Sequence, residues 1–370
     1  SLFPNAPPGS MPNSLALSPD GELLFVANAN NNNVAVFDVE TAGKARSLGF
    51  IPVGWFPTSV RVTSDGKTLV VANGKGFSSA ANPRGPFPGS PVPRNLQEYI
   101  GGLMQGTVSL IELPGEKKRA EQFGAWSQTA FACSPLDAGA TARGVGARPA
   151  GSPIPAKVGD PSPIKYVIYV IRENRTYDQV FGDIAEGNGD ARLCLFPERV
   201  TPNAHALARE FGLFDNFYAD GEVSADGHEW SMGAQATDFV EKMWPLSYGH
   251  NAKKKYDYPS EGHYPVAFPA NGYLWNRAAE AGVSYRSYGE FCDTPKSGPL
   301  LSVPSLPILV GHVDPYYRAW DMEYPDVKRA ERFAAEGGTI LLGRVRGFGR
   351  DGDRVTSVKI TDQELPAKAV

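Results

Sequence analysis

The stretch "PNSLALSPDGELLFVAN" (residues 12–28) aligns without gaps with "PTSVRVTSDGKTLVVAN" (residues 57–73). The two similar stretches begin at residues 12 and 57, so they are offset by 45 residues. Each copy predicts a strand, an Asp-Gly turn and a second strand, because alternating apolar residues flank the Asp-Gly pair. A third β-rich run follows each copy, at residues 33–39 and 106–113. A repeat of this length built from short strands is typical of a β-propeller blade. We therefore expect residues 1–113 to form two all-β, propeller-like blades.

Two blades are fewer than the roughly four to eight that close a propeller. We expect the uncovered strands to pack either on further blades that precede Ser1 or on the second domain of the chain. The second copy also carries an insertion at residues 74–105 that is rich in Gly, Pro and Ser, which predicts a loop.

The overall composition excludes several classes of protein. The 370 residues are 42% hydrophobic and 21% charged, with a net charge of -4, so a nucleic acid partner is not expected. A stretch of about 20 apolar residues is missing, so we expect no transmembrane segment. Cys133, Cys194 and Cys292 are widely spaced, which leaves open one disulfide with a free thiol or three reduced thiols.

The second half of the chain has a different pattern. Residues 114–163 include a long Ala/Gly/Pro-rich stretch, which predicts a linker. Residues 164–335 then predict an α/β domain with a mostly parallel sheet, and residues 336–370 form a tail of uncertain assignment. The expected strands and helices alternate: strands at 164–171, 215–220 and 283–291, and helices at 201–214, 272–282 and 325–338.

Two polar residues, Glu173 and Asn174, come directly after the first of these strands. Ligands bind beyond the carboxyl ends of the strands in an open parallel sheet, and carboxylate and amide oxygens suit a divalent cation. A capped turn is the alternative interpretation of the pair. Arg172 and Arg175 flank it and can bind phosphate oxygens, or can pair with nearby carboxylates.

A second polar stretch, "DGEVSADGHEWS" (residues 220–231), follows the second predicted strand. Ser224 lies there in a segment of small residues, and His228 comes four residues later. A nucleophilic serine needs an exposed turn and a base or a metal that activates it. His228 is a candidate base, phosphate donor or metal ligand, and a surface turn is the alternative.

These motifs resemble two known families. "SPDGELLFVANANNNNVAVFDV" (residues 18–39) resembles the YVTN-type propeller repeat. "IRENRTYDQVFGD" (residues 171–183) and "DNFYADGEVSADGHEW" (residues 215–230) resemble the bacterial phosphoesterases of the phospholipase C and acid phosphatase type, within the alkaline-phosphatase-like superfamily. The resemblance implies that Glu173, Asn174 and Ser224 bind metal and that Ser224 is the nucleophile.

The resemblance implies a metal-dependent phosphoesterase whose divalent metal is Ca, Mn, Mg or Zn. Its substrate would be a small phosphate ester or a phospholipid, and its location periplasmic or secreted. The family's later ligands, an Asn-Asp-His segment, an acidic pair and a further His, have no counterpart after Phe333. We therefore expect a chain truncated at both ends and an incomplete α/β domain. The alternative function is a non-catalytic β-propeller binding or surface protein with a degenerate phosphoesterase domain.

Overall fold

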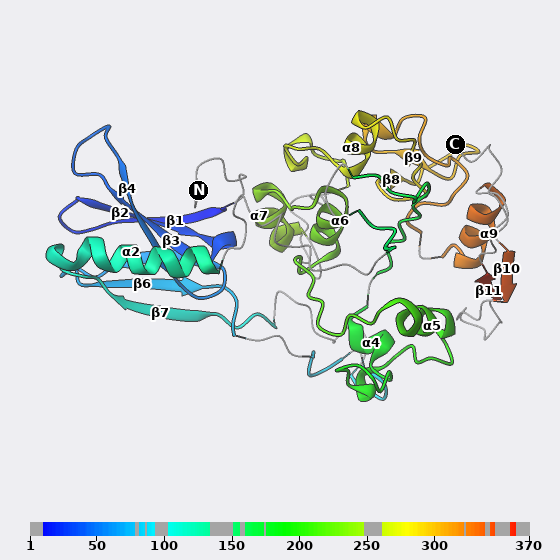
Figure 1. Cartoon of the computed structure of the whole chain (residues 1–370), viewed down its shortest axis with the longest axis horizontal. Coiled ribbons are helices and arrows are strands. Elements are labelled where there is room, and N and C mark those ends of the chain that lie inside the picture. The colour runs from blue at the N-terminus through cyan, green and yellow to red at the C-terminus, as the bar shows by residue number, and fades with distance from the viewer. Residues whose placement is uncertain are drawn as a thin grey trace. The chain divides into compact units, whose positions relative to one another are not determined.

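The computed structural model divides the chain into two compact units, each described here by itself (Figure 1). The N-terminal unit contains Ser1–Ala81 and Gly101–Val170, and the second unit contains Asn82–Ile100 and Ile171–Val370. The structure describes residues 10–77, 81–85, 87–92, 103–133, 151–155, 160–173, 175–247, 261–321, 323–336, 341–344 and 356–359.

The described residues of the N-terminal unit contain two antiparallel sheets and one long helix. Sheet 1 has four strands in the order β1-β2-β3-β4, and sheet 2 has three in the order β5-β6-β7. The elements are β1 (Pro12–Leu17), β2 (Leu23–Asn28), β3 (Asn33–Asp38), β4 (Arg46–Pro52), β5 (Pro57–Val62), β6 (Thr68–Asn73), β7 (Thr107–Glu112) and α2 (Glu116–Ala132). The antiparallel blade-like sheets predicted from the repeat are confirmed.

The two copies of the repeat have the same local geometry. The pairing of β1 with β2 shifts register between Pro12 and Ser14. The pairing of β5 with β6 shifts register between Pro57 and Ser59, at the equivalent point of the second copy. A bulge that recurs at matching positions shows that the repeated sequence specifies the strand geometry, and not only the presence of strands.

The Asp-Gly turns also match. Gly21 has a φ angle of 79° and Gly66 one of 71°, values that favour glycine because it lacks a Cβ. Asp20 accepts a hydrogen bond from the backbone N–H of Glu22, as Asp65 does from that of Lys67. These side chain to backbone bonds stabilise the reversal that brings each pair of strands together.

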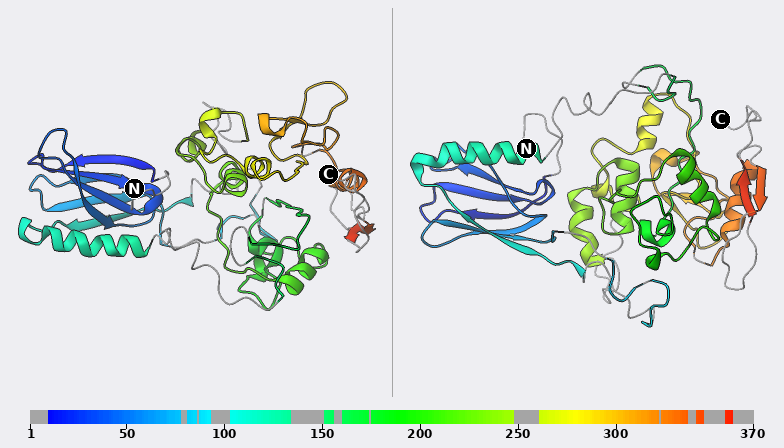
Figure 2. Two further views of the ribbon diagram at one scale, coloured as in Figure 1. Left: turned by 45° about the horizontal axis from the view of Figure 1, so that its top comes forward. Right: turned by 60° about the horizontal axis from the view of Figure 1, so that its bottom comes forward.

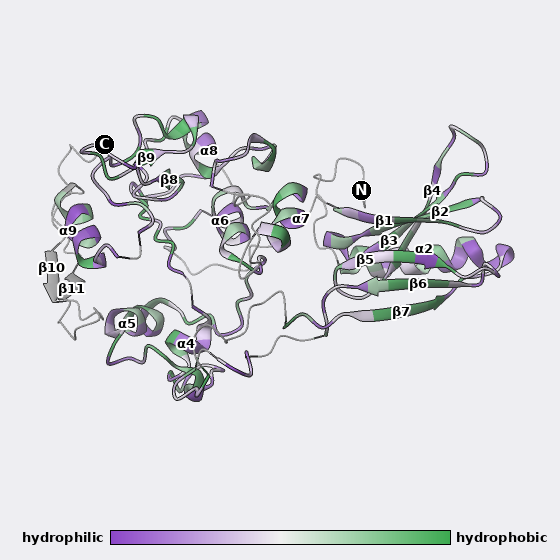
Figure 3. Cartoon of the chain, turned by 180° about the vertical axis from the view of Figure 1, so that it is seen from behind, coloured by the Kyte–Doolittle hydropathy of each residue, from purple (hydrophilic) through white to green (hydrophobic). Residues whose placement is uncertain are grey.

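The core of this unit lies between the two sheets. Apolar side chains from both sheets bury one another there, together with Phe123 of α2. Figure 3 shows hydrophobic segments, in green, along strands of both sheets. Their burial supplies the main driving force for joining the sheets, since apolar side chains removed from water contribute about 1.5–3 kcal/mol each. The fully buried members are Phe25, Ala27, Val34, Val36, Val60, Leu69 and Val71.

Helix α2 lies in the segment that the sequence predicts to be a linker, so that prediction is wrong for residues 116–132. The helix packs along β4 (Figure 2). Ser127 of the helix bonds the backbone of this strand. The Ser127 Oγ accepts a hydrogen bond of 2.9 Å from the backbone N–H of Phe50 and donates one of 2.6 Å to the carbonyl oxygen of Phe123. A Cβ on Gly49 would collide with this hydroxyl, which explains the glycine beside it.

Replacing Ser127 with alanine is expected to lower the free energy of unfolding of the N-terminal unit by about 2 kcal/mol. The variant leaves the buried N–H of Phe50 without its acceptor, and an unsatisfied buried donor costs about 1–3 kcal/mol. Urea unfolding monitored by tryptophan fluorescence measures the change. Thr129→Ala is the matched control, because the hydroxyl of Thr129 is exposed and bonds only within the helix. Equal midpoints for the two variants would contradict the prediction.

The second unit is mostly helical in its described part. The helices predicted at 201–214, 272–282 and 325–338 are confirmed in position as α5, α8 and α9. Its helices are α4 (Tyr177–Phe181), α5 (Pro202–Phe211), α6 (Ser224–Gly233), α7 (Asp238–Ser247), α8 (Leu274–Glu280) and α9 (Asp326–Glu336). Its short strands are β8 (Cys292–Asp293), β9 (Val303–Pro304), β10 (Leu341–Arg344) and β11 (Thr356–Lys359).

The strands predicted for a parallel sheet do not form. Residues 164–171 and 215–220 contain no strand, and residues 283–291 contribute one isolated parallel bridge, from Ser287 to Val313. A strand needs a neighbour for its backbone N–H and C=O groups, and the described residues place none beside 164–171. Its side chains stay exposed instead, with Val167 at 82%. Residues 164–171 therefore have the composition of a strand, but they do not form part of a sheet among the described residues.

Candidate active site

Ser224 is the first residue of helix α6, after Val223 at the N-cap. The backbone N–H groups of a first helical turn point outward and favour negative charge, so this position suits an anionic reactant. His228 lies one turn later on the same face, as expected for residues four apart. Gly221 approaches Asp226 of this helix so closely that a Cβ would collide with it. The loop before Ser224 therefore requires glycine.

Glu173 approaches this face of α6 from the loop that follows residue 171. Its Oε2 lies 3.6 Å from the Nε2 of His228. Hydrogen bonds from His228 and, to a smaller degree, from the Ser224 hydroxyl hold the pKa of Glu173 below its ordinary value, although burial acts in the opposite direction. The structure thus brings Glu173 close to Ser224 and His228, which lie about fifty residues later in the sequence.

Two further glutamates, which the sequence analysis missed, surround the same imidazole. Glu290 Oε1 lies 2.8 Å from Nδ1 of His228, and Glu261 Oε1 lies 3.8 Å from Nε2. Burial disfavours the charged imidazole, but hydrogen bonds to Glu173 and Glu290 and the charge of Glu261 outweigh it and raise the pKa of His228 to about 11. Three carboxylates from separate segments therefore surround one imidazolium.

Glu261 occupies the least favourable position of the three. Burial raises its pKa, and the nearby carboxylates of Glu290 and Glu173 add to the effect, while His228 opposes it. Its backbone has a φ of 58°, which is uncommon for a residue with a side chain. The Ser305 hydroxyl donates a hydrogen bond of 2.6 Å to its carbonyl oxygen. Glu261 and Glu290 carry no recognisable spacing relative to Ser224, so only the fold could reveal them.

The other predicted site residues, Asn174, Arg172 and Arg175, have no described contact with Glu173, Ser224 or His228. Asn174 lies outside the described residues. Arg172 is exposed, and Arg175 lies with its guanidinium carbon 5.2 Å from the centroid of the Phe196 ring. Their predicted contacts with a phosphate group stay predictions.

A second acidic group lies on the buried side of the same helix. Among the described residues, Glu222, Asp226 and Glu241 are the group of three whose potential ligand atoms all lie within 4.8 Å of one another. Asp226 is fully buried and Glu241 nearly so. Carboxylate oxygens of this kind suit hard divalent cations. Helix α6 therefore carries acidic neighbours on two sides.

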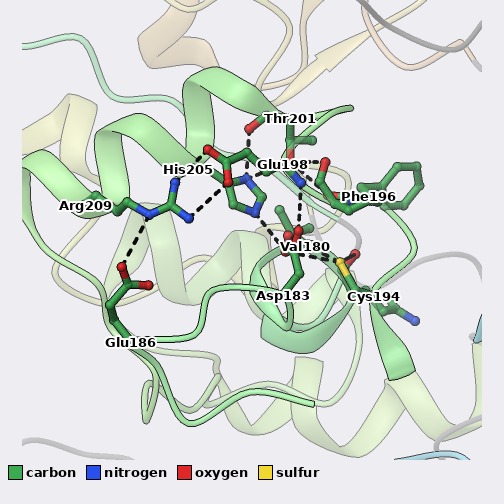
Figure 4. Close-up of polar contacts among 11 residues, drawn as sticks. Val180, Asp183, Glu186, Cys194, Phe196, Glu198, Thr201, His205 and Arg209 are labelled. Carbon is green, nitrogen blue, oxygen red and sulfur yellow. Dashed lines mark hydrogen bonds and ion pairs between the residues drawn. The ribbon is translucent and has the colours of Figure 1, made fainter. Parts of the chain in front are cut away.

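His205 belongs to a separate and fully hydrogen-bonded cluster around Asp183 (Figure 4). The His205 side chain is buried, with Nε2 2.9 Å from Asp183 Oδ1 and Nδ1 3.0 Å from Thr201 Oγ1. Although burial acts to raise the pKa of Asp183, hydrogen bonds from His205, the Glu198 amide and the Cys194 thiol hold it below its ordinary value. Because the imidazole is buried and both ring nitrogens have partners, it fixes Asp183 against α5.

The three cysteines are free thiols with different surroundings. Burial raises the pKa of both Cys194 and Cys292, and Asp183 raises that of Cys194 further. We expect Cys133, which is exposed, to react with an aromatic disulfide reagent at pH 8 at least about tenfold faster than the other two, because the thiolate is the reactive form. Peptide mapping after short labelling measures this order. In Cys133→Ser, the fast phase should vanish, and a persisting fast phase would contradict the assignment.

Comparison with known proteins supports the propeller part of the chain. Residues 3–80 match the family described as lactonase, 7-bladed beta-propeller, over the segment that contains β1 to β6. No curated protein matches the chain. None of the described helices is long and apolar enough to cross a membrane.

Three solved structures share short segments with the chain, each with a TM-score of 0.17. Kuenenia stuttgartiensis hydrazine synthase is 29% identical over 19% of this chain and 20% of its own. A protein of unknown function from Desulfotomaculum acetoxidans DSM 771 is 25% identical over 17% of this chain and 20% of its own. Saccharomyces cerevisiae Sqt1 is 19% identical over 18% of each chain. The matched part thus spans about a fifth of each of these structures.

Proposed function

We propose that the second unit hydrolyses phosphate esters, with Ser224 as the nucleophile and a divalent cation as cofactor. The observation that carries this proposal is that Glu173, His228 and Ser224 meet at the start of α6: Glu173 Oε2 lies 3.6 Å from Nε2 of His228, and the Ser224 hydroxyl contributes to lowering the pKa of Glu173. A hydroxyl near a carboxylate and a helix N-terminus has both a proton acceptor and a place for an anionic phosphate. Small phosphomonoesters and phospholipids are the proposed substrates, and a periplasmic or secreted location belongs to the same proposal.

Each residue has a definite role in the proposed step. Glu173 accepts the proton of Ser224 while Oγ forms a bond to phosphorus and the bond from phosphorus to the leaving alcohol breaks. The N–H groups of the first turn of α6 hold the phosphate oxygens. His228 donates its Nε2 proton to the leaving oxygen, and Glu290 orients the imidazole through its 2.8 Å contact with Nδ1. Arg172 and Arg175 are proposed as further phosphate ligands. Water then releases phosphate from the serine.

The carboxylate-rich setting fits a divalent cation. Glu173, Asn174 and Ser224 are the proposed ligands, and Glu261 and Glu290 are further oxygen donors on the same side. The fit rests on the geometry of the donors: Glu173, Glu261 and Glu290 gather around His228, at 3.6, 3.8 and 2.8 Å. Partial burial raises the pKa of Glu261, and the carboxylates of Glu290 and Glu173 add to this effect against the opposing charge of His228, so a bound cation would favour its charged form. A cation held there supplies charge neutralisation for the phosphate group.

The test is hydrolysis of p-nitrophenyl phosphate and bis(p-nitrophenyl) phosphate by the purified full chain. We expect release of p-nitrophenol with added Ca, Mn, Mg or Zn and loss of the activity with EDTA. Acid quenching during turnover should trap one phosphoryl group on the peptide that contains Ser224. Folded protein that shows no hydrolysis above the EDTA control with any of the four metals would refute the proposal.

A second candidate is a non-catalytic binding protein built on the propeller-like sheets. Two observations favour it: the propeller family matches this part of the chain, and apolar side chains such as Val167 and Val170 lie exposed, at 82% and 66%. The two candidates differ in their response to metal, because a ligand that binds only the folded state raises its stability. A melting temperature unchanged by all four cations would favour the binding protein.

A further inference from the structure

Equivalent positions of the two repeats differ sharply in exposure at the first strand of each sheet. The 45-residue offset makes Val60 of β5 the counterpart of Leu15 of β1, since 15 plus 45 is 60. Val60 is 0% exposed, whereas Leu15 is 62% exposed and Leu17, two residues on, is 57% exposed. The side of sheet 1 that carries Leu15 and Leu17 is called the leading face.

The third strands show the opposite difference. Strand β7 pairs with β6 in the register in which β3 pairs with β2, so Val108 is the counterpart of Val34. By the same pairing, Leu110 is the counterpart of Val36. Val34 and Val36 are both 0% exposed, whereas Val108 is 63% and Leu110 72% exposed. The side of sheet 2 that carries Val108 and Leu110 is called the trailing face.

The contact inside the chain shows what covers such faces. The Val34 and Val36 side of sheet 1 and the Val60 side of sheet 2 bury each other in one hydrophobic core. The trailing face of sheet 2 is thus the counterpart of the Val34 and Val36 side of sheet 1. The leading face of sheet 1 is the counterpart of the Val60 side of sheet 2. One half of a blade contact is exposed at each end of the unit.

We propose that the trailing face of one copy packs on the leading face of a second copy of this chain. The contact is heterologous, because different faces meet, so repeating it either closes a ring or extends a filament. Three or four copies with two sheets each would supply six or eight sheets, within the range of about four to eight with which propellers close. This inference concerns the N-terminal unit and does not rest on the proposed hydrolase function.

Helix α2 leaves room for this contact. It covers the leading side of sheet 1 at β3 and β4, where Ala130 packs with Ala35 and Phe50, and Val26 of β2 packs against this cluster. The contact inside the chain joins β5 mainly to β1 and β2. A second copy would use these same inner strands, and Leu15 and Leu17 lie on β1, where they stay exposed.

The test is the mass of the full chain in solution by light scattering after size exclusion. Wild type should form assemblies larger than a dimer. Leu15→Asp/Leu17→Asp, which alters the leading face, and Val108→Asp/Leu110→Asp, which alters the trailing face, should each be monomeric. Mixing the two variants should restore dimers only. The intact trailing face of the first variant can pack on the intact leading face of the second, and the altered faces that remain at both ends of the dimer prevent further growth. Leu207→Asp on α5 is the control for an exposed leucine outside both faces and should keep the wild-type mass.

Cross-linking gives a second measurement in case the aspartate variants do not fold. In a Cys133→Ser background, a chain with Leu17→Cys and a chain with Leu110→Cys should form a disulfide with each other under mild oxidation. A monomeric wild type at all concentrations would overturn the proposal and assign the two faces to a different partner. An assembly whose mass is unchanged in both aspartate variants would overturn it as well.

Discussion

Replacing Ser224 with alanine is expected to lower the rate of phosphate ester hydrolysis about 10⁴-fold while leaving the fold intact. The hydroxyl is the proposed nucleophile, and removing a nucleophile abolishes the covalent route. Ser224 is not part of a hydrophobic core, so the loss should appear in kcat and not in the melting temperature. Steady-state hydrolysis of p-nitrophenyl phosphate with the activating metal measures it, and the trapped phosphopeptide should disappear.

Two variants of the same helix sharpen this experiment. Ser224→Thr keeps a hydroxyl at the same position and should retain measurable activity. Ser231→Ala removes a hydroxyl that donates to the carbonyl oxygen of His228 and is not placed in the chemistry, so its rate should stay near wild type. A phosphoryl group still trapped in Ser224→Ala would assign the nucleophile to another residue.

Replacing Arg332 with methionine is expected to lower the stability of the second unit by about 3–5 kcal/mol. Its guanidinium donates two hydrogen bonds to Asp314, of 2.9 Å from Nε and 2.8 Å from Nη2. The Asp314 side chain is fully buried. Breaking a buried ion pair from one side leaves an uncompensated charge, which costs about this amount. Thermal and urea unfolding followed by circular dichroism measure the change.

The double variant Asp314→Asn/Arg332→Met should recover much of this loss, because it removes the orphaned charge together with its partner. Arg277→Met is the control, since Arg277 pairs with Glu280 on an exposed helix surface, where such pairs contribute about 0.3–0.5 kcal/mol. A double variant that is as unstable as Arg332→Met would show that packing, and not charge, dominates at this position.

The fold was predictable where the signal is local. The Asp20-Gly21 turn and its counterpart lie between strands that pair with their sequence neighbours, so a short quoted stretch contains the whole unit of structure. The sheet predicted for the second unit depends on pairing between distant strands, and strand propensity at residues 164–171 does not provide a neighbour. Helix α2 was missed because the Ala/Gly/Pro-rich composition that follows it was extended over residues 116–132.

The residues of the candidate site were likewise predictable only where the sequence signal is local. Ser224 and His228 were recognisable because they lie four residues apart in a polar segment of small residues after a predicted strand, and Glu173 was recognisable because it follows an apolar run. The helix that begins at Ser224 was not predicted. Glu261 and Glu290 approach His228 from distant segments, and no spacing in the sequence links them to it. The burial of His205 was not predictable from its own helix, because the ring contacts Asp183 and Phe181 of another segment.

The sequential strand order of the N-terminal unit has a consequence for biosynthesis. Sheet 1 consists of four consecutive strands, so it can assemble as soon as residue 52 has left the ribosome. The carboxylates around His228 come from segments as far apart as residues 173 and 290, so that centre can form only after residue 290 has been synthesised. Nascent chains arrested at successive lengths should therefore acquire protease resistance first in the blades, well before the environment of His228 exists.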